Sequence, residues 1–202
     1  GETHQGLFDL SFLATIPNMT IMSPKNRWEM ADMVRYAVNF GYPIALRYPR
    51  GTAYEGLKEF RAPIAYGKSE VLFEEEDIAV LFVGHMAAVA EAVRYSLKDI
   101  GYSCSLVNAR FVKPLDTEIL ERMAEEHQLF VTIEENVLSG GYGERVLEYV
   151  SRARLGVHVL NIGIPDDYVE HGNVDVLRHE VGLDCETIVK QVITDYVTIR
   201  NE

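Results

Sequence analysis

Two short segments of this chain carry residue types that could do chemistry. The first, Thr3-His4-Gln5-Gly6, places a histidine next to a glycine. Histidine titrates near neutral pH and can pass protons to and from a carbonyl group, and glycine lets backbone approach a ligand closely. A histidine this close to a chain end is more often a solvated terminal residue, so the tetrapeptide alone does not establish a site.

The second segment, residues 47–51 (RYPRG), lies at the C-terminal end of a predicted strand. In open α/β sheets, ligands bind beyond the carboxyl ends of the strands. A guanidinium group can hold a phosphate through two parallel hydrogen bonds, so Arg47 and Arg50 form a candidate phosphate site. The sequence is equally compatible with structural ion pairs between one or both arginines and the abundant carboxylates.

The other chemically suggestive residues fit structural roles better. Glu134 and Glu135 end a predicted strand, where adjacent side chains point to opposite faces, so we expect one of them to cap or pair locally. The glycine turn at 140–143 (GGYG) lacks the spacing of a dinucleotide fingerprint and the lysine of a P-loop. We interpret that turn as structural and His85 as a turn residue. Three further histidines match no metal-ligand pattern: His127, His158 and His179.

The elements that would position these residues follow a strand–helix alternation. Apolar strands are predicted at 19–22, 43–48, 69–73, 78–83, 104–108, 129–133 and 157–162. Helices are predicted from an N-cap at Ser23 to Phe40, and over 89–100, 116–123, 143–153 and 184–196. This alternation predicts an α/β fold with a mostly parallel sheet and helices on both faces.

Composition excludes several classes of partner. The 202-residue chain has a formal net charge of -12 and a pI of about 5.0, which argues against nucleic acid. No apolar stretch is long enough to span a membrane, and residues 1–4 do not resemble a signal peptide. Cys104 and Cys185 match no metal spacing. We therefore expect a reduced, cytoplasmic protein without a metal site.

The sequence divides unevenly. Residues 1–50 hold about two strands and two helices, fewer than a doubly wound sheet needs. Residues 51–65 are irregular and are interpreted as a linker, and residues 66–202 as a second α/β domain. We therefore expect that the upstream half of the first domain is missing from this chain.

Several runs resemble a known family. GETHQGLFDLSFLATIPNMTIMSPKN, followed by PIALRYPRG, is similar to the pyrimidine-binding domain of 1-deoxy-D-xylulose-5-phosphate synthases, within the transketolase superfamily. VNARFVKPLD, TIEENVLSGGYG and VLNIGIPDDYVEHG are similar to the C-terminal domain of the same family. The resemblance covers nearly the whole chain in order. It identifies residues 1–50 as the C-terminal half of a pyrimidine-binding domain and residues 66–202 as a transketolase C-terminal-like domain.

The resemblance implies a parent enzyme that uses thiamine diphosphate and Mg²⁺. Such an enzyme condenses pyruvate with glyceraldehyde 3-phosphate to 1-deoxy-D-xylulose 5-phosphate, with loss of CO₂, and is a homodimer. His4 matches the family's active-site histidine, Arg50 matches the arginine that binds the aldehyde's phosphate, and Arg47 would be supporting structure. The Gly-Asp-Gly motif that holds the diphosphate and metal is absent. We therefore expect no cofactor bound to this fragment and no activity from it alone.

Two other interpretations stay open. The chain could be one subunit of a transketolase-like enzyme split over two genes, or a non-catalytic module for dimerisation or scaffolding. The first lacks half of its pyrimidine-binding domain, and the second would not need both His4 and Arg50. We also expect His4 to be mobile without its upstream neighbours.

Overall fold

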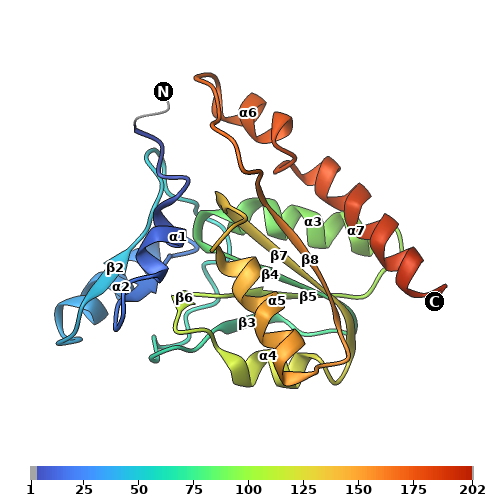
Figure 1. The fold of residues 1–202 in the computed structure, drawn as a ribbon, viewed down its shortest axis with the longest axis horizontal. Helices are drawn as coiled ribbons and strands as arrows, with labels where there is room; N and C mark the ends of the chain where they lie inside the picture. Colours follow the sequence, from blue (N-terminus) through green and yellow to red (C-terminus); the bar gives the residue numbers. More distant parts are fainter. Residues whose placement is uncertain (1–3, 202) are drawn as a thin grey trace.

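Two sheets organise residues 4–201, the part of the chain that the computed structural model describes (Figure 1). The strands are β1 Thr20–Met22, β2 Ile44–Leu46, β3 Glu70–Phe73, β4 Asp77–Phe82, β5 Cys104–Asn108, β6 Phe111–Lys113, β7 His127–Val137 and β8 His158–Ile164. The larger sheet has the order β3-β5-β4-β7-β8, and the smaller sheet has the order β2-β1-β6. In the larger sheet only the edge strand β3 is antiparallel to its neighbour. The predicted α/β class with a mostly parallel sheet is confirmed.

Helices cover both faces of the larger sheet (Figure 1). They are α1 Asp9–Ala14, α2 Arg27–Val38, α3 Ala87–Asp99, α4 Thr117–Met123, α5 Tyr142–Ala153, α6 Val174–Glu180 and α7 Cys185–Ile199, with a short 3₁₀ helix, η2, at Gly84–Met86. Helices α3 and α7 pack on one face, while α1, α4 and α5 pack on the other. Asp116 and Asp184 cap α4 and α7 as the sequence predicts.

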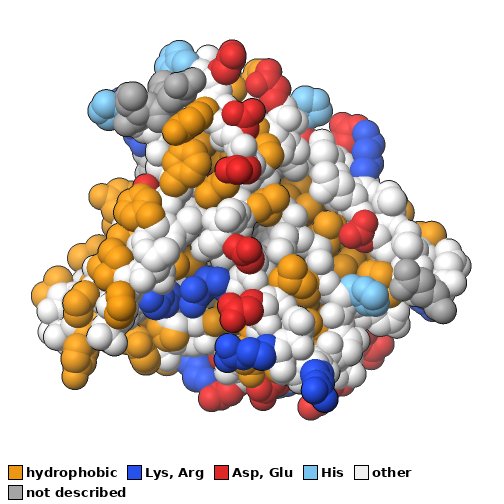
Figure 2. All heavy atoms as spheres, viewed as in Figure 1, with side chains coloured by type: hydrophobic (Ala, Val, Ile, Leu, Met, Phe, Trp, Pro, Cys, Tyr) orange, Lys and Arg blue, Asp and Glu red, His pale blue; other side chains and the backbone are white. Residues whose placement is uncertain are grey.

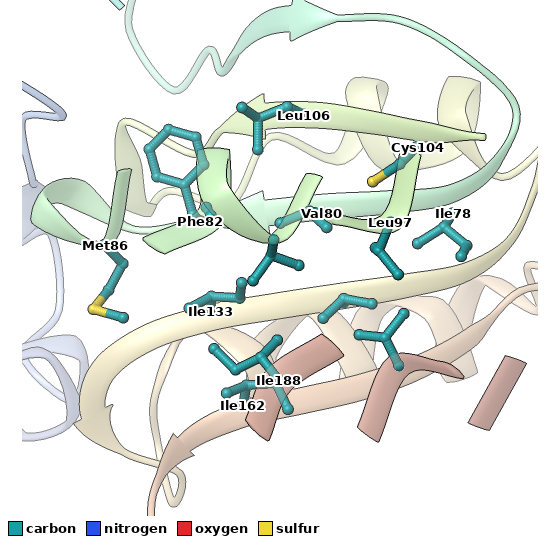
Figure 3. Close-up of a cluster of buried hydrophobic side chains, with 14 of the residues drawn as sticks. Ile78, Val80, Phe82, Met86, Leu97, Cys104, Leu106, Ile133, Ile162 and Ile188 are labelled. Carbon is teal, nitrogen blue, oxygen red and sulfur yellow. The ribbon is translucent and has the colours of Figure 1, made fainter. Parts of the chain in front are cut away.

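The central strand β4 explains why this core forms. Parallel strands covered on both faces read as continuous apolar runs, and residues 78–83 are all buried hydrophobics. Ile78, Val80 and Phe82 point to the α3–α7 side, where they meet Leu97 and Ile188 (Figure 3). The alternate residues of the strand face α1, α4 and α5. The helices on both faces of the sheet therefore pack against side chains of β4.

The start of α2 differs from the prediction. Ser23 does not cap this helix, because its hydroxyl donates to the Arg47 carbonyl at 2.8 Å. The N-cap is Asn26, whose side chain accepts from the Glu29 amide, and the helix runs from Arg27 to Val38. The predicted end at Phe40 is two residues too late. Asn26 supplies the side-chain acceptor that an N-cap needs.

The smaller sheet joins residues that are far apart in the sequence. Strands β1 and β2 are parallel, and β6 adds to β1 antiparallel, pairing Ile21 with Lys113 and Met22 with Phe111. Between β2 and β3 the chain forms no regular helix or strand. Strands β1 and β2, from the first fifty residues, are thus held by β6, which follows β5 in the sequence.

A buried charge cluster reinforces this joint. Lys25 Nζ lies 3.0 Å from Glu29 and 2.5 Å from Glu70, and its side chain is 1% exposed. Arg110 contacts the same two carboxylates at 2.8 and 3.0 Å, and Asn108 donates to Glu29. Two cations and two anions share the cluster, so it carries no net charge. Buried charges are tolerated when they are paired and hydrogen-bonded in this way.

Among residues 4–201, no helix combines the length and apolar character needed to cross a membrane.

Candidate functional site

The structure brings the two sequence-predicted segments together. Arg47 follows β2, and its guanidinium donates to the Gly6 carbonyl at 3.3 Å and to the Glu135 carbonyl at 2.9 Å. Its side chain is only 11% exposed. Arg47 therefore acts as supporting structure, and it fixes the segment that contains His4 beside the one that contains Arg50. Thr3 lies outside the described residues.

Arg50 lies differently from Arg47. Its side chain is exposed, and no carboxylate of the described residues forms an ion pair with it. It lines a hollow of ≈ 330 Å³ together with residues 24–26, residues 48–51, Tyr54 and His85. Of the two alternatives left open by the sequence, the structural ion pair applies to Arg47, which lies 3.8 Å from the Glu135 carboxylate. The phosphate-binding role of Arg50 stays a prediction.

The N-terminus of α2 builds one wall of this hollow. The Asn26 side chain donates to the carbonyl of Gly56 at 3.0 Å, and the Arg27 amide donates to the carbonyl of Tyr54 at 3.2 Å. The Tyr54 hydroxyl in turn donates to the carboxylate of Glu91 on α3. Burial and this contact raise the pKa of Tyr54, so the hydroxyl stays protonated. The loop after Arg50 is thus tied to both helices.

The segment containing His4 is anchored by residues of the second α/β region. The Gln5 side chain donates to the Val169 carbonyl, and the Leu7 carbonyl accepts from the Val137 amide at 2.7 Å. His4 itself is exposed. Its catalytic role and its expected mobility stay predictions.

A buried polar network lies under both segments. His85, in η2 after β4, has Nδ1 2.9 Å from the Arg47 guanidinium and Nε2 3.0 Å from the Glu135 carboxylate. Arg178 on α6 donates to the same carboxylate at 2.9 and 2.7 Å. Burial alone would raise the pKa of Glu135, but His85 and Arg178 outweigh it and lower that pKa to about 2. Glu135 is therefore a permanent anion between basic side chains.

This network was not predicted from the sequence, in which His85 was interpreted as a turn residue and Arg178 had no assigned role. The available signal was positional: His85 and Glu135 come from the carboxyl ends of the neighbouring parallel strands β4 and β7, where polar residues of an α/β sheet gather. Burial lowers the pKa of His85 and, helped by Arg47 and Arg178, outweighs the opposing effect of Glu135, so the ring is mainly neutral at pH 7.

The hydrogen bonds of Glu134 support the interpretation of the glycine turn at 140–143 as structural. Its carboxylate accepts from the amides of Tyr142 and Gly143 at 2.8 Å each, at the N-terminus of α5. An anion-binding helix end is thus filled by the chain's own side chain. A Cβ on Gly141 would lie 2.5 Å from this carboxylate. Burial raises the pKa of Glu134 to about 7 despite the two backbone donors.

No cluster of three metal-ligating side chains occurs among residues 4–201. His127 is buried and bonded to the Met123 carbonyl and the Ser105 hydroxyl at 2.6 and 2.8 Å. His179 lies 3.1 Å from Asp184. Two of the three histidines that match no metal pattern thus have ordinary structural partners, and the third, His158, is exposed.

Comparison with known proteins identifies the class of protein that this fold and site define. The family model described as "Transketolase, C-terminal domain" matches residues 67–188, and the one described as "Transketolase, pyrimidine binding domain" matches residues 1–55. The chain belongs to the transketolase family. Over 98% of its length it resembles a solved structure titled "Split gene transketolase, inactive beta4 tetramer", with a TM-score of 0.90, 26% identity and 64% of that chain covered.

Within the family, the chain is similar to 1-deoxy-D-xylulose-5-phosphate synthases. It is 47% identical to that of Lachnoclostridium phytofermentans over 95% of this chain and 31% of the relative. It is 43% identical to that of Clostridium acetobutylicum over 96% of this chain and 32% of the relative. The resemblance drawn from the motifs is confirmed. The chain spans about a third of the length of these relatives.

Proposed function

We propose that this chain is the C-terminal part of a thiamine-diphosphate-dependent synthase that condenses pyruvate with glyceraldehyde 3-phosphate. The product would be 1-deoxy-D-xylulose 5-phosphate, with loss of CO₂. In this assignment residues 1–50 are the second half of the pyrimidine-binding domain, 51–65 the linker, and 66–202 the C-terminal domain. The similarity to synthases of two bacteria supports the reaction.

One observation carries the proposal at the level of residues. Arg50 is an exposed cation without an ion-pair partner among the described residues, and it lines a hollow beside the segment that carries His4. Keeping it unpaired favours binding of an external anion, and its planar fork suits a phosphate.

The residues of this chain fit the acceptor-substrate side of the reaction. Arg50 would bind the phosphate and orient the aldehyde, and His4 would exchange a proton with the oxygen of that carbonyl. Thiamine diphosphate supplies the electron sink for decarboxylation when bound. The described residues offer no cluster for Mg²⁺, and the sequence contains no Gly-Asp-Gly. In this proposal the cofactor and Mg²⁺ are held mainly by other parts of the enzyme.

The test uses a longer protein that carries this chain, mixed with pyruvate, glyceraldehyde 3-phosphate, Mg²⁺ and thiamine diphosphate, with product followed by NMR. Arg50→Ala should raise the KM for the aldehyde about 10- to 100-fold, because it removes charge-assisted hydrogen bonds. The matched control is Arg27→Ala, which removes an arginine that is 59% exposed and paired with Glu55. Equal KM values in the two variants would remove Arg50 from the phosphate site. Absence of any sugar phosphate product would overturn the reaction itself.

A second candidate is a subunit of a transketolase-like enzyme made from two chains. The structural similarity to the split gene transketolase favours it, since the match covers nearly all of this chain. The two candidates differ in substrate: a transketolase transfers a two-carbon unit between sugars and needs no pyruvate. Release of CO₂ from pyruvate therefore distinguishes them.

We further propose that the protein is a homodimer. Figure 2 shows hydrophobic side chains gathered over the side of the molecule that holds α1, α2 and β2. Val34, Val38 and Tyr42 are 43%, 79% and 74% exposed there. Extensive exposed apolar surface is typical of a protein–protein contact, and light scattering would show whether two copies associate.

A further inference from the structure

The backbone at Arg47 and the backbone at Gly6 are held in different ways. The backbone of Arg47 is held by its own sheet, since its amide donates to the Met22 carbonyl at 2.9 Å and its carbonyl accepts from Ser23. At residues 5–8 the chain forms neither helix nor strand, and its backbone contact with the larger sheet is made by the Leu7 carbonyl, which accepts from the Val137 amide of β7 at 2.7 Å. The Arg47 guanidinium thus links residue 47, which strand β1 holds, to residues 5–8, which lie outside the helices and strands.

The bridge has a defined orientation because of His85. A guanidinium can only donate, so the His85 Nδ1 at 2.9 Å must accept, and the ring proton sits on Nε2. Nε2 lies 3.0 Å from the Glu135 carboxylate, although this contact lacks the geometry of a hydrogen bond. The carboxylate is therefore close to both His85 and Arg47 and acts on them mainly through its charge.

Glu135 is the residue on which this arrangement depends. Its carboxylate lies near Arg47, which follows β2, near His85 of η2 and near Arg178 of α6. Its own carbonyl accepts from Arg47 at 2.9 Å. Without the carboxylate, Arg47 and Arg178 would be two cations facing each other across a neutral histidine. Arg47 would then turn away from the Gly6 carbonyl to find solvent or another anion.

We propose that Glu135 is a positioning residue for His4: through Arg47 its carboxylate holds the Gly6 carbonyl, two residues after His4, in place. The inference rests on the proposed function, and it gives the C-terminal domain a part in the reaction beyond scaffolding. It also separates two roles. Arg50 is linked to Arg47 through a backbone that β1 already holds, so loss of Glu135 should disturb His4 and leave the phosphate site intact.

Two other hydrogen bonds also hold the segment that contains His4. The Leu7 carbonyl accepts from Val137 at 2.7 Å, and Gln5 donates to Val169. If these two contacts alone fix the segment, the Arg47–Glu135 bridge adds nothing to its order. Exchange of the Val137 amide distinguishes the two cases, because this N–H donates to the Leu7 carbonyl and so reports on the segment without catalysis.

The first experiment is hydrogen exchange on the 202-residue chain with Glu135→Gln. Exchange at the Val137 amide should become about tenfold faster, as expected for loss of a bond to a charged group, while the Arg47 amide, which donates to the Met22 carbonyl, keeps its rate. Glu75→Gln is the matched control: Glu75 is 22% exposed against 19% for Glu135, and it also pairs with two cations, Arg94 and Lys98. Unchanged exchange at the Val137 amide in Glu135→Gln would overturn the proposal.

Two further variants guard against simple misfolding. Arg47→Lys keeps the charge but loses the planar fork that contacts three acceptors, so exchange at the Val137 amide should also become faster. Glu135→Asp keeps the anion and should restore part of the protection. Exchange that is fast in Glu135→Asp and slow in Arg47→Lys would contradict the bridge.

The second experiment measures kinetics in the longer protein. Glu135→Gln should lower kcat about tenfold and leave the KM for glyceraldehyde 3-phosphate within about twofold, whereas Arg50→Ala raises that KM. A raised KM with unchanged kcat in Glu135→Gln would overturn the positioning role while leaving the proposed function standing. If the wild-type protein forms no product, the proposed function fails, and the exchange experiment still decides the role of Glu135.

Discussion

Removing one carboxylate from the buried charge cluster should destabilise the fold far more than removing a surface charge. Glu29 accepts from the Lys25 amide at 2.6 Å, from Lys25 Nζ at 3.0 Å, from Asn108 at 2.9 Å and from Arg110 at 2.8 Å. Glu29→Gln leaves two cations facing the single carboxylate of Glu70, so the buried cluster gains a net charge of +1.

The expected loss is about 3–5 kcal/mol in the free energy of unfolding, the range for breaking a buried ion pair from one side. The assay is urea unfolding of the chain at pH 7. Glu186→Gln is the control, because its pair with Lys190 is 74% and 72% exposed and such pairs are worth less than about 1 kcal/mol.

A double variant tests the cause. Lys25→Met combined with Glu29→Gln returns the cluster to neutrality, with Arg110 facing Glu70 at 3.0 Å. Its loss of stability should therefore be smaller than the sum of the two single losses. A Glu29→Gln loss below about 1 kcal/mol, or strict additivity in the double variant, would show that the cluster is not a coupled charge network.

The remaining predictions concern pH and packing. Burial raises the pKa of Glu134 from 4.5 to about 7, so its contribution to stability is complete below pH 4.5 and is lost as pH rises to 7. The pKa of Glu135 is lowered from 4.5 to about 2, so its contribution is present above pH 4.5 and is lost as pH falls to 2. In unfolding curves from pH 2 to 8, Glu134→Gln should flatten only the upper slope and Glu135→Gln only the lower one; the reverse assignment would refute both shifts. Gly143→Ala should destabilise by about 1–3 kcal/mol, because its Cβ would lie 2.4 Å from the Thr132 hydroxyl, whereas Gly156→Ala meets nothing within 4 Å and should be neutral in the same assay.

The five-stranded sheet could be predicted from the sequence because its signals are local. The apolar runs at 78–83 and 104–108 are buried on both faces, and such runs identify parallel strands without knowledge of their partners. Helices α4 and α7 begin after Asp116 and Asp184, which cap them by hydrogen bonds to their own next turn. Each of these features depends on fewer than a dozen neighbouring residues.

The elements without a local signal were not predicted. Helix α6 has no buried residue, so it shows no apolar stripe at helical spacing. Strand β6 is three residues long and exists because it pairs with β1, about ninety positions earlier. Arg110, with φ 56°, turns the chain out of the larger sheet between β5 and β6. A positive φ at arginine is rare, and sequence patterns give no reason to expect it.

The geometry of the candidate site also depends on contacts between residues that are far apart in the sequence. Alternation along β7 predicts that Glu134 and Glu135 point to opposite faces, and they do: one caps α5 and the other meets Arg178. Alternation cannot say which face holds the cations, since Arg47 lies 88 positions from Glu135 and Arg178 lies 43. The choice is made by topology, which sets the carboxyl ends of β4 and β7 beside the end of β2. The geometry of this site is therefore set by the order of the strands. Residues whose sequence context gives no sign of function form a network only in the folded protein.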